Sequence, residues 1–156
     1  MIFVTVGTHY LPFERLIKKM DEIAGTIDEE VIAQIGSTKY RPKNMTYFTF
    51  KDENEILELY KKARIIVSHA GVGSLLTLIN YSKPVIVVPR LKNFNEVIDN
   101  HQLELVEIMK NRENFIVIYD TKNLEDALKE NVISNRDKNK KDKRLINFLK
   151  KLIETM

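Results

Sequence analysis

The sequence predicts an α/β protein: one domain with a doubly wound, Rossmann-like parallel sheet of six strands. Short apolar runs rich in Val and Ile alternate along the chain with segments of helical apolar spacing. This alternation is typical of β–α–β units with right-handed crossovers. The short runs are mostly apolar throughout rather than at every second residue, which indicates strands covered on both faces. The length of 156 residues fits a single domain with its own core.

The apolar runs define the predicted strands. The run TYFTF alternates polar and apolar residues more than the others do, which favours a place near an edge of the sheet. The six predicted strands are 2–6, 31–35, 46–50, 65–68, 85–89 and 115–119.

Helical spacing fills the segments between these runs. The first predicted helix covers 12–24, and Pro12 fits its first turn because proline is tolerated there. Asp52 is expected to cap the next helix, with Glu55 three residues later completing a capping box. The remaining predicted helices are 53–63, 73–82, 95–111, 123–131 and 142–155.

The net charge of +3 is unevenly distributed. Residues 136–151 carry eight Lys and Arg against two Asp, or +6, which leaves the rest of the chain near 3 − 6 = −3. The body of the protein therefore lacks the basic surface of nucleic-acid-binding proteins. We expect 1–132 to form the Rossmann-like domain and 133–156 a basic connector and an amphipathic helix. That helix packs on its own domain, or else on a protein partner or an anionic membrane surface.

The composition excludes several other classes. There is no cysteine, so disulfides, thiolate zinc sites and cysteine nucleophiles are excluded. The first residues, MIFVTVG, are predicted as a strand rather than a signal peptide. No apolar run approaches the roughly 20 residues that span a bilayer. We expect a cytoplasmic protein.

The predicted topology places a ligand site at one edge of the sheet. In the common strand order 3-2-1-4-5-6, the first and fourth strands are neighbours at the switch point, and ligands bind beyond their carboxyl ends. The loops GTHYLP and HAGVGS leave these two strands. His9 and His69 are therefore expected to face each other, with His101 on the same edge after the fifth strand.

The HAGVGS segment is the strongest local motif. Gly71 and Gly73 allow the backbone to approach a ligand closely, and Ser74 falls in the first turn of a helix, where free N–H groups favour an anion. A phosphate loop explains this pattern, and a tight structural turn that needs small residues explains it equally well.

Two flanking segments carry further polar groups. After the first strand, Thr8 offers a hydroxyl and His9 is a phosphate donor, a base or an inert turn residue. The start of the helix after the fifth strand holds Asn100, His101 and Gln102, which suit sugar hydroxyls or else a solvated helix face. We expect no metal site, because the histidines lack ligand-pair spacing and no Asp-x-Asp pair is present.

Several blocks in order carry a family resemblance. The blocks MIFVTVGTH, QIGST, FTFKDENEILELYKKARIIVSHAGVGS, KPVIVVPR and DNHQLELVE resemble the family 28 glycosyltransferases, over residues 1 to about 110. They are most similar to stand-alone copies of the nucleotide-binding C-terminal half of that family. The resemblance implies half of a GT-B architecture, which a second subunit completes.

The resemblance also implies a function. It implies a donor-binding subunit of a two-component inverting enzyme that moves a hexose or N-acetylhexosamine from a UDP-sugar, without cofactor or bound metal. The implied partner is a membrane-anchored glycosyltransferase subunit that binds a lipid-linked sugar acceptor for polysaccharide or glycan synthesis. This implied partner recruits the chain to the cytoplasmic face of the membrane. We expect no nucleic-acid partner, and exposed surfaces make a homodimer plausible when the partner is absent.

The resemblance assigns roles to particular residues. Thr77 stands where many members carry a glutamate that binds ribose hydroxyls, and Arg90 ends the KPVIVVPR block and is expected in the substrate site. The implied contacts are Gly7, Thr8, His9, His69, Gly71, Gly73 and Ser74 to the diphosphate, Phe50 and Lys51 to uracil, and Asn100, His101 and Gln102 to ribose or donor sugar.

Three interpretations remain open at this point. In the first, the chain is the donor half of an enzyme, and His9 is its best candidate for the general base, although the base could equally lie in the partner. In the second, the chain is a non-catalytic enhancer with a vestigial donor site, which Thr77 favours. In the third, it is a nucleotide-binding regulator, which a crevice at the switch point permits.

Overall fold

The computed structural model describes residues 1–130 and, further along, Asn147, Phe148, Lys150, Lys151 and Glu154. Most of the predicted connector and C-terminal helix at 133–156 therefore lies outside the described residues. Phe148, which is within them, is partly buried against the core cluster that holds Phe3.

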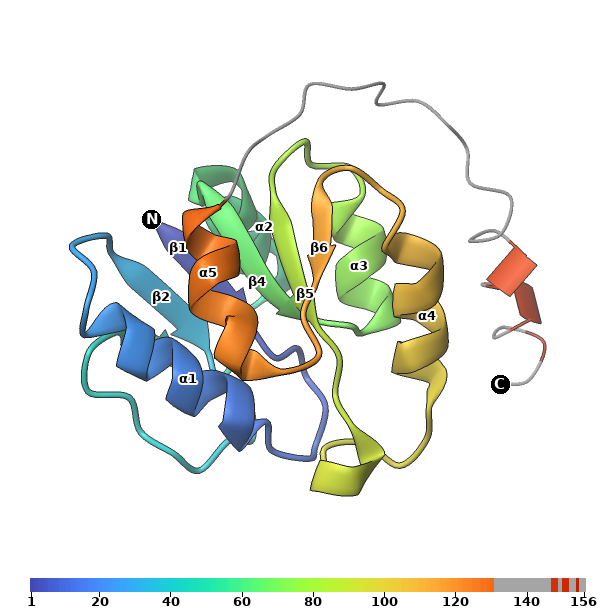
Figure 1. Cartoon of the computed structure of the whole chain (residues 1–156), viewed down its shortest axis with the longest axis horizontal. Helices are drawn as coiled ribbons and strands as arrows, with labels where there is room; N and C mark the ends of the chain where they lie inside the picture. The colour runs from blue at the N-terminus through green and yellow to red at the C-terminus, as the bar shows by residue number, and fades with distance from the viewer. Residues whose placement is uncertain (131–146, 149, 152–153, 155–156) are drawn as a thin grey trace.

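The described residues form a sheet of six parallel strands in the order β3-β2-β1-β4-β5-β6 (Figure 1). This confirms the predicted doubly wound α/β class and the predicted strand order. It also confirms the edge position of the TYFTF strand, which is β3. The strands are β1 (Ile2–Thr5), β2 (Val31–Gln34), β3 (Thr46–Phe48), β4 (Ile65–His69), β5 (Val85–Val88) and β6 (Phe115–Val117).

Helices cover both faces of the sheet and make two hydrophobic layers. The helices α1 (Glu14–Ala24) and α5 (Leu124–Lys129) pack on one face, and α2 (Glu53–Lys62), α3 (Val72–Leu78) and α4 (His101–Met109) pack on the other (Figure 1). Successive residues of β1 enter opposite layers, because strand side chains alternate between faces. Ile2 and Val4 join the α1 side and Phe3 joins the α2 side. This two-sided burial explains why the strand runs are apolar throughout.

The capping prediction for α2 is confirmed. The backbone N–H of Glu55 donates to Asp52 Oδ1 at 2.9 Å, and the Asp52 N–H donates back to Glu55 Oε2 at 3.2 Å. This reciprocal pair satisfies two N–H groups that have no acceptor within the helix.

Two predicted helix starts were wrong. Helix α1 begins at Glu14 with Phe13 as its N-cap, so Pro12 precedes the helix instead of lying in its first turn. Helix α4 begins at His101 rather than at 95, since a short 3₁₀ turn (Lys92–Phe94) ends at Asn95 in the left-handed region, with φ 55°. A right-handed helix cannot continue through a left-handed residue, so α4 cannot include Asn95. It starts after its N-cap, Asn100.

No helix in the described part of the chain combines the length and the apolar composition needed to cross a membrane.

Candidate functional site

The loops that leave β1 and β4 meet around one histidine. His69 ends β4, and its ring fills the space between Gly7 and Gly71. A Cβ on Gly7 would lie 2.3 Å from Nε2 of His69, and a Cβ on Gly71 would lie 2.0 Å from Cε1. Gly7 also has a φ of +69°, which favours glycine. The His69 ring therefore fits only because positions 7 and 71 lack a side chain. The spacing of the glycines in the sequence did not reveal this reason.

His69 is a neutral group inside this junction. Its side chain is buried, Nε2 lies 3.1 Å from Ser74 Oγ, and Nδ1 has no hydrogen-bond partner among the described residues. Burial, with the charge of Arg90 and the titratable ring of His9 nearby, lowers its pKa to about 3. The ring therefore carries no charge at neutral pH and acts only through hydrogen bonding.

His9 lies on the β1 loop at the same edge of the sheet. Its ring is half-buried and stacks on Tyr10, with ring centroids 4.8 Å apart. Its Nδ1 accepts a 3.1 Å hydrogen bond from the backbone N–H of Leu11. Burial and the charge of Arg90 lower the pKa of His9, while Asp99 opposes the shift.

Arg90 lies inside the protein rather than on the surface of the site. Its side chain is 1% exposed. The guanidinium donates to backbone oxygens of the segments that follow β1 and β5: Val6 at 3.0 Å, Leu11 at 3.0 Å, Pro12 at 3.2 Å and Glu96 at 3.2 Å. Burial lowers its pKa to about 10, so it stays charged at neutrality. The expectation from the sequence was that Arg90 contacts substrate, whereas its side chain here holds the segments that follow β1 and β5.

An ion pair between Arg15 and Glu96 supports the segment between β5 and α4. The sequence analysis missed this pair. The guanidinium of Arg15 donates to both carboxylate oxygens of Glu96, at 2.9 and 3.2 Å, and the Glu96 side chain is 5% exposed. Glu96 also accepts from the backbone N–H of Leu91 at 3.0 Å. The two partners are 81 residues apart in sequence, so no local pattern could pair them.

The NHQ segment lies at the start of α4, beside this network. Gln102 Oε1 accepts from the backbone N–H of Arg90 at 3.0 Å, which fixes the side chain and leaves its amide N–H groups for another partner. His101 is exposed, and its Nδ1 lies 3.5 Å from Asp99 Oδ2. Asn100 is exposed and makes no side-chain cap bond.

The remaining predicted residues lie on other parts of this edge. Phe50, beyond the end of β3, is 50% exposed. The Lys51 ammonium lies 5.0 Å from the centroid of the Phe48 ring and 3.4 Å from a Glu55 oxygen. Thr8 is exposed, and a Cβ on Gly73 would meet nothing within 4 Å, so the space there is open. The hydroxyl of Thr77 donates to the Gly73 oxygen of its own helix at 3.0 Å.

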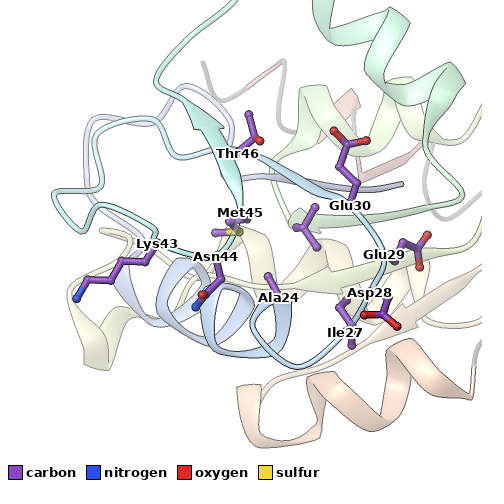
Figure 2. A pocket seen from close by; sticks show the side chains of 10 residues that line it. Ala24, Ile27, Asp28, Glu29, Glu30, Lys43, Asn44, Met45 and Thr46 are labelled. Carbon is purple, nitrogen blue, oxygen red and sulfur yellow. The ribbon is translucent and has the colours of Figure 1, made fainter.

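A hollow lies at the opposite, amino edge of the sheet. It has a volume of about 470 Å³ and lies between the end of α1 and the residues that lead into β2 and β3 (Figure 2). Its lining includes the consecutive carboxylates Asp28, Glu29 and Glu30, with Lys43 among its other residues. Glu29 is held by Arg64, which lowers its pKa to about 2. This acidic lining is unsuited to a diphosphate. Among the described residues, no group of three His, Asp or Glu side chains is arranged to hold a metal ion.

Comparison with known sequences gives one family. Residues 1–156 match the glycosyltransferase family 28 C-terminal domain. The chain is 29% identical over 118 residues to the UDP-N-acetylglucosamine transferase subunit ALG13 of Candida albicans, covering 76% of this chain and 36% of that protein. It is 32% identical over 117 residues to the human subunit of the same name, covering 68% of this chain and 10% of that protein. The chain thus spans about a third of the first relative and a tenth of the second.

Comparison with solved structures agrees with this fold. The glycotransferase of kitacinnamycin superposes with a TM-score of 0.59 at 17% identity, covering 98% of this chain and 38% of that one. Spinosyn forosaminyltransferase SpnP gives a TM-score of 0.57 at 14% identity, covering 81% and 33%. In both, the match is to part of a larger chain.

Proposed function

Since the chain belongs to the glycosyltransferase family 28 C-terminal domain family, we propose that it is the donor-binding subunit of a two-component, UDP-sugar-dependent glycosyltransferase. The donor sugar is a hexose or N-acetylhexosamine. A membrane-anchored subunit supplies the other half of the cleft and presents a lipid-linked acceptor at the cytoplasmic face. Two relatives are named as subunits of a UDP-N-acetylglucosamine transferase, which supports the two-component arrangement and favours N-acetylglucosamine as the donor sugar.

The observation that carries the proposal is the junction of the β1 and β4 loops. Gly7 and Gly71 close on the neutral ring of His69, and Ser74 lies 3.1 Å from that ring. This junction stands at the switch point of a doubly wound sheet, beyond the carboxyl ends of the strands, where such sheets bind nucleotides.

The residues of this junction suit a diphosphate. The first-turn N–H groups of α3, including those of Gly73 and Ser74, have no acceptor within the helix. The open space at Gly73 lets a ligand reach them. When the glycosidic bond breaks, negative charge develops on the diphosphate, and fixed donors at this place stabilise it. No bound metal is part of the proposal, so N–H and hydroxyl donors carry this role.

The proposal predicts little or no activity for the chain alone. One half of a cleft binds the donor, but it neither positions an acceptor hydroxyl nor excludes water. A non-catalytic enhancer is the second candidate. Thr77 favours this candidate, because it stands where many members of the family carry a ribose-binding glutamate. The Thr77 hydroxyl instead bonds to an oxygen of its own helix.

Calorimetric titration of the purified chain with UDP, with ADP as the control ligand, tests the proposal. We expect UDP-selective binding that Ser74→Asp abolishes, because the new carboxylate repels the diphosphate. Ser82→Asp is the matched control, since Ser82 is exposed in the turn after α3 and precedes β5 at the amino edge. Absence of binding to either nucleotide would contradict the donor role and favour the enhancer.

A further inference from the structure

We propose that His9 acts in the donor site as a neutral hydrogen-bond donor, through Nε2–H to the diphosphate leaving group, and that it is not the general base. This inference rests on the proposed function. It replaces the role of base that the sequence suggested for His9.

The first observation is the hydrogen bond from the Leu11 backbone to the ring of His9. The N–H of Leu11 can only donate, so the Nδ1 atom that it contacts at 3.1 Å must present a lone pair. A neutral imidazole carries one proton, and that proton is therefore on Nε2. The β1 loop itself selects the tautomer, through a contact between residues two positions apart.

The second observation is that the ring is held in this orientation. Tyr10 stacks on His9 with an interplanar angle of 17°, and the Leu11 contact anchors the Nδ1 edge. Nε2 is separated from Nδ1 by Cε1, so a hydrogen on Nε2 does not point at the Leu11 amide. To act as a base through Nε2, the ring would have to carry its proton on Nδ1, where it would point at the Leu11 N–H. That arrangement sets two donors against each other and loses the hydrogen bond.

The third observation is the charge around the ring. The groups that act on His9 are the guanidinium of Arg90, the imidazole of His69 and the carboxylate of Asp99. The Arg90 guanidinium is fixed by four backbone oxygens and cannot move away when a second positive charge forms. Arg90 and partial burial together lower the pKa of His9, with Asp99 opposing them. Accepting a proton is therefore costly here, whereas donating a hydrogen bond as a neutral group is not.

The transfer step then divides between the two subunits. The acceptor oxygen forms the new bond to the anomeric carbon and loses its proton to a base in the partner subunit. The bond between the anomeric carbon and the phosphate oxygen breaks, and its electron pair stays on the diphosphate. The Nε2–H of His9 donates to that oxygen and keeps its proton throughout.

Two variants separate the two roles. His9→Gln places an amide N–H near the position of Nε2 but has no basicity, whereas His9→Asn is too short to reach. We expect His9→Gln to bind UDP within about threefold of the wild-type chain. We expect His9→Asn to bind at least roughly tenfold more weakly, the typical effect of losing a hydrogen bond to a charged group. Uridine, which lacks the diphosphate, should bind equally to all three chains.

A second measurement tests the tautomer without any ligand. The ¹⁵N chemical shifts of the His9 ring in the full-length wild-type chain distinguish a proton on Nε2 from one on Nδ1. We expect the Nε2–H form near neutral pH. Finding the Nδ1–H form, or equal UDP affinity in wild type and a folded His9→Asn, would overturn the inference while leaving the donor role intact. A wild-type chain that does not bind UDP would overturn the proposed function and this inference with it.

Discussion

The guanidinium of Arg90 donates a 3.0 Å hydrogen bond to the backbone oxygen of Val6. Arg90 follows β5 and Val6 follows β1, and these strands are not neighbours, because β4 lies between them. The side chain thus reaches over the end of β4, where His69 stands. One buried side chain therefore ties the carboxyl end of β5 to that of β1, across the strand between them.

Arg90→Met is expected to destabilise the fold strongly. It leaves four backbone oxygens without their donor, and we expect a loss of roughly 3–5 kcal/mol in the free energy of unfolding, measured by urea titration. Arg41→Met is the matched control, because Arg41 is exposed and makes one bond, to the Thr38 oxygen. Equal losses in the two variants would show that the contacts of Arg90 are not energetically special.

The three glycines of the two loops should respond differently to alanine. Gly7→Ala and Gly71→Ala place a methyl group within 2.3 Å of the His69 ring, so we expect each to lower the melting temperature markedly. Gly73→Ala meets nothing within 4 Å and falls in a helix, so its melting temperature should hold or rise slightly.

A double-mutant cycle checks the cause of this difference. If the His69 ring creates the clash, adding His69→Ala should recover part of the stability lost in Gly71→Ala. Strictly additive losses would show that the clash with the ring is not responsible. Thermal unfolding by circular dichroism measures all four chains.

Gln102→Glu should separate binding from folding. The new carboxylate still accepts from the Arg90 N–H, as Gln102 Oε1 does at 3.0 Å, so stability should change by less than about 1 kcal/mol. It also replaces the free amide donor with a negative charge near the expected diphosphate, so we expect UDP affinity to fall roughly tenfold or more. Gln102→Leu, which removes the acceptor, should instead lose stability. Unchanged UDP binding in Gln102→Glu would show that the UDP-sugar does not bind near Gln102.

The burial of His69 predicts a pH dependence of stability. Its pKa is about 3 in the folded chain against an ordinary value of 6.5, so between these values the unfolded chain binds more protons. The free energy of unfolding should therefore fall as the pH drops below about 6.5, by at most roughly 1.4 kcal/mol per pH unit. Between pH 6.5 and 5, ordinary carboxylates contribute little to this slope.

Urea unfolding at several pH values measures that slope. His9 has a pKa shifted in the same direction, so the comparison is best made in the His9→Gln background. We expect His69→Asn to flatten the slope in that background, whatever its effect on absolute stability. The same slope with and without His69 would mean that this ring is not the titrating group.

Much of the fold followed from patterns that are local in the sequence. Runs such as VIVV are apolar on every residue because both faces of β5 are covered, and right-handed crossovers then favour the observed strand order. Asp52 and Glu55 were sufficient to predict a helix cap, since a cap depends on residues three apart. The start of α4 was not predictable in the same way, because it depends on Asn95 adopting a left-handed conformation.

The meeting of the β1 and β4 loops at one edge of the sheet was predictable, but the contacts between them were not. Gly71, Gly73, His69 and Ser74 were proposed because their loop was predicted to follow a strand and open a helix, which it does. Arg90 was assigned to the substrate site because it ends the KPVIVVPR block that carries the family resemblance, and only the three-dimensional structure shows its bonds to residues 78 to 84 positions away. The pairing of Arg15 with Glu96 has no sequence signal for the same reason.

The central place of β1 has a consequence for how the chain is made. Residues 2–5 are synthesised before both of their partners, since they pair with residues 31–34 on one side and 65–68 on the other. At roughly 5–20 residues per second, this apolar strand waits several seconds with at least one edge unpaired. During that time it can pair with other chains, so a nascent chain that stalls before β4 leaves this edge open to aggregation. The strand that anchors the finished sheet is therefore the one that most needs protection during synthesis.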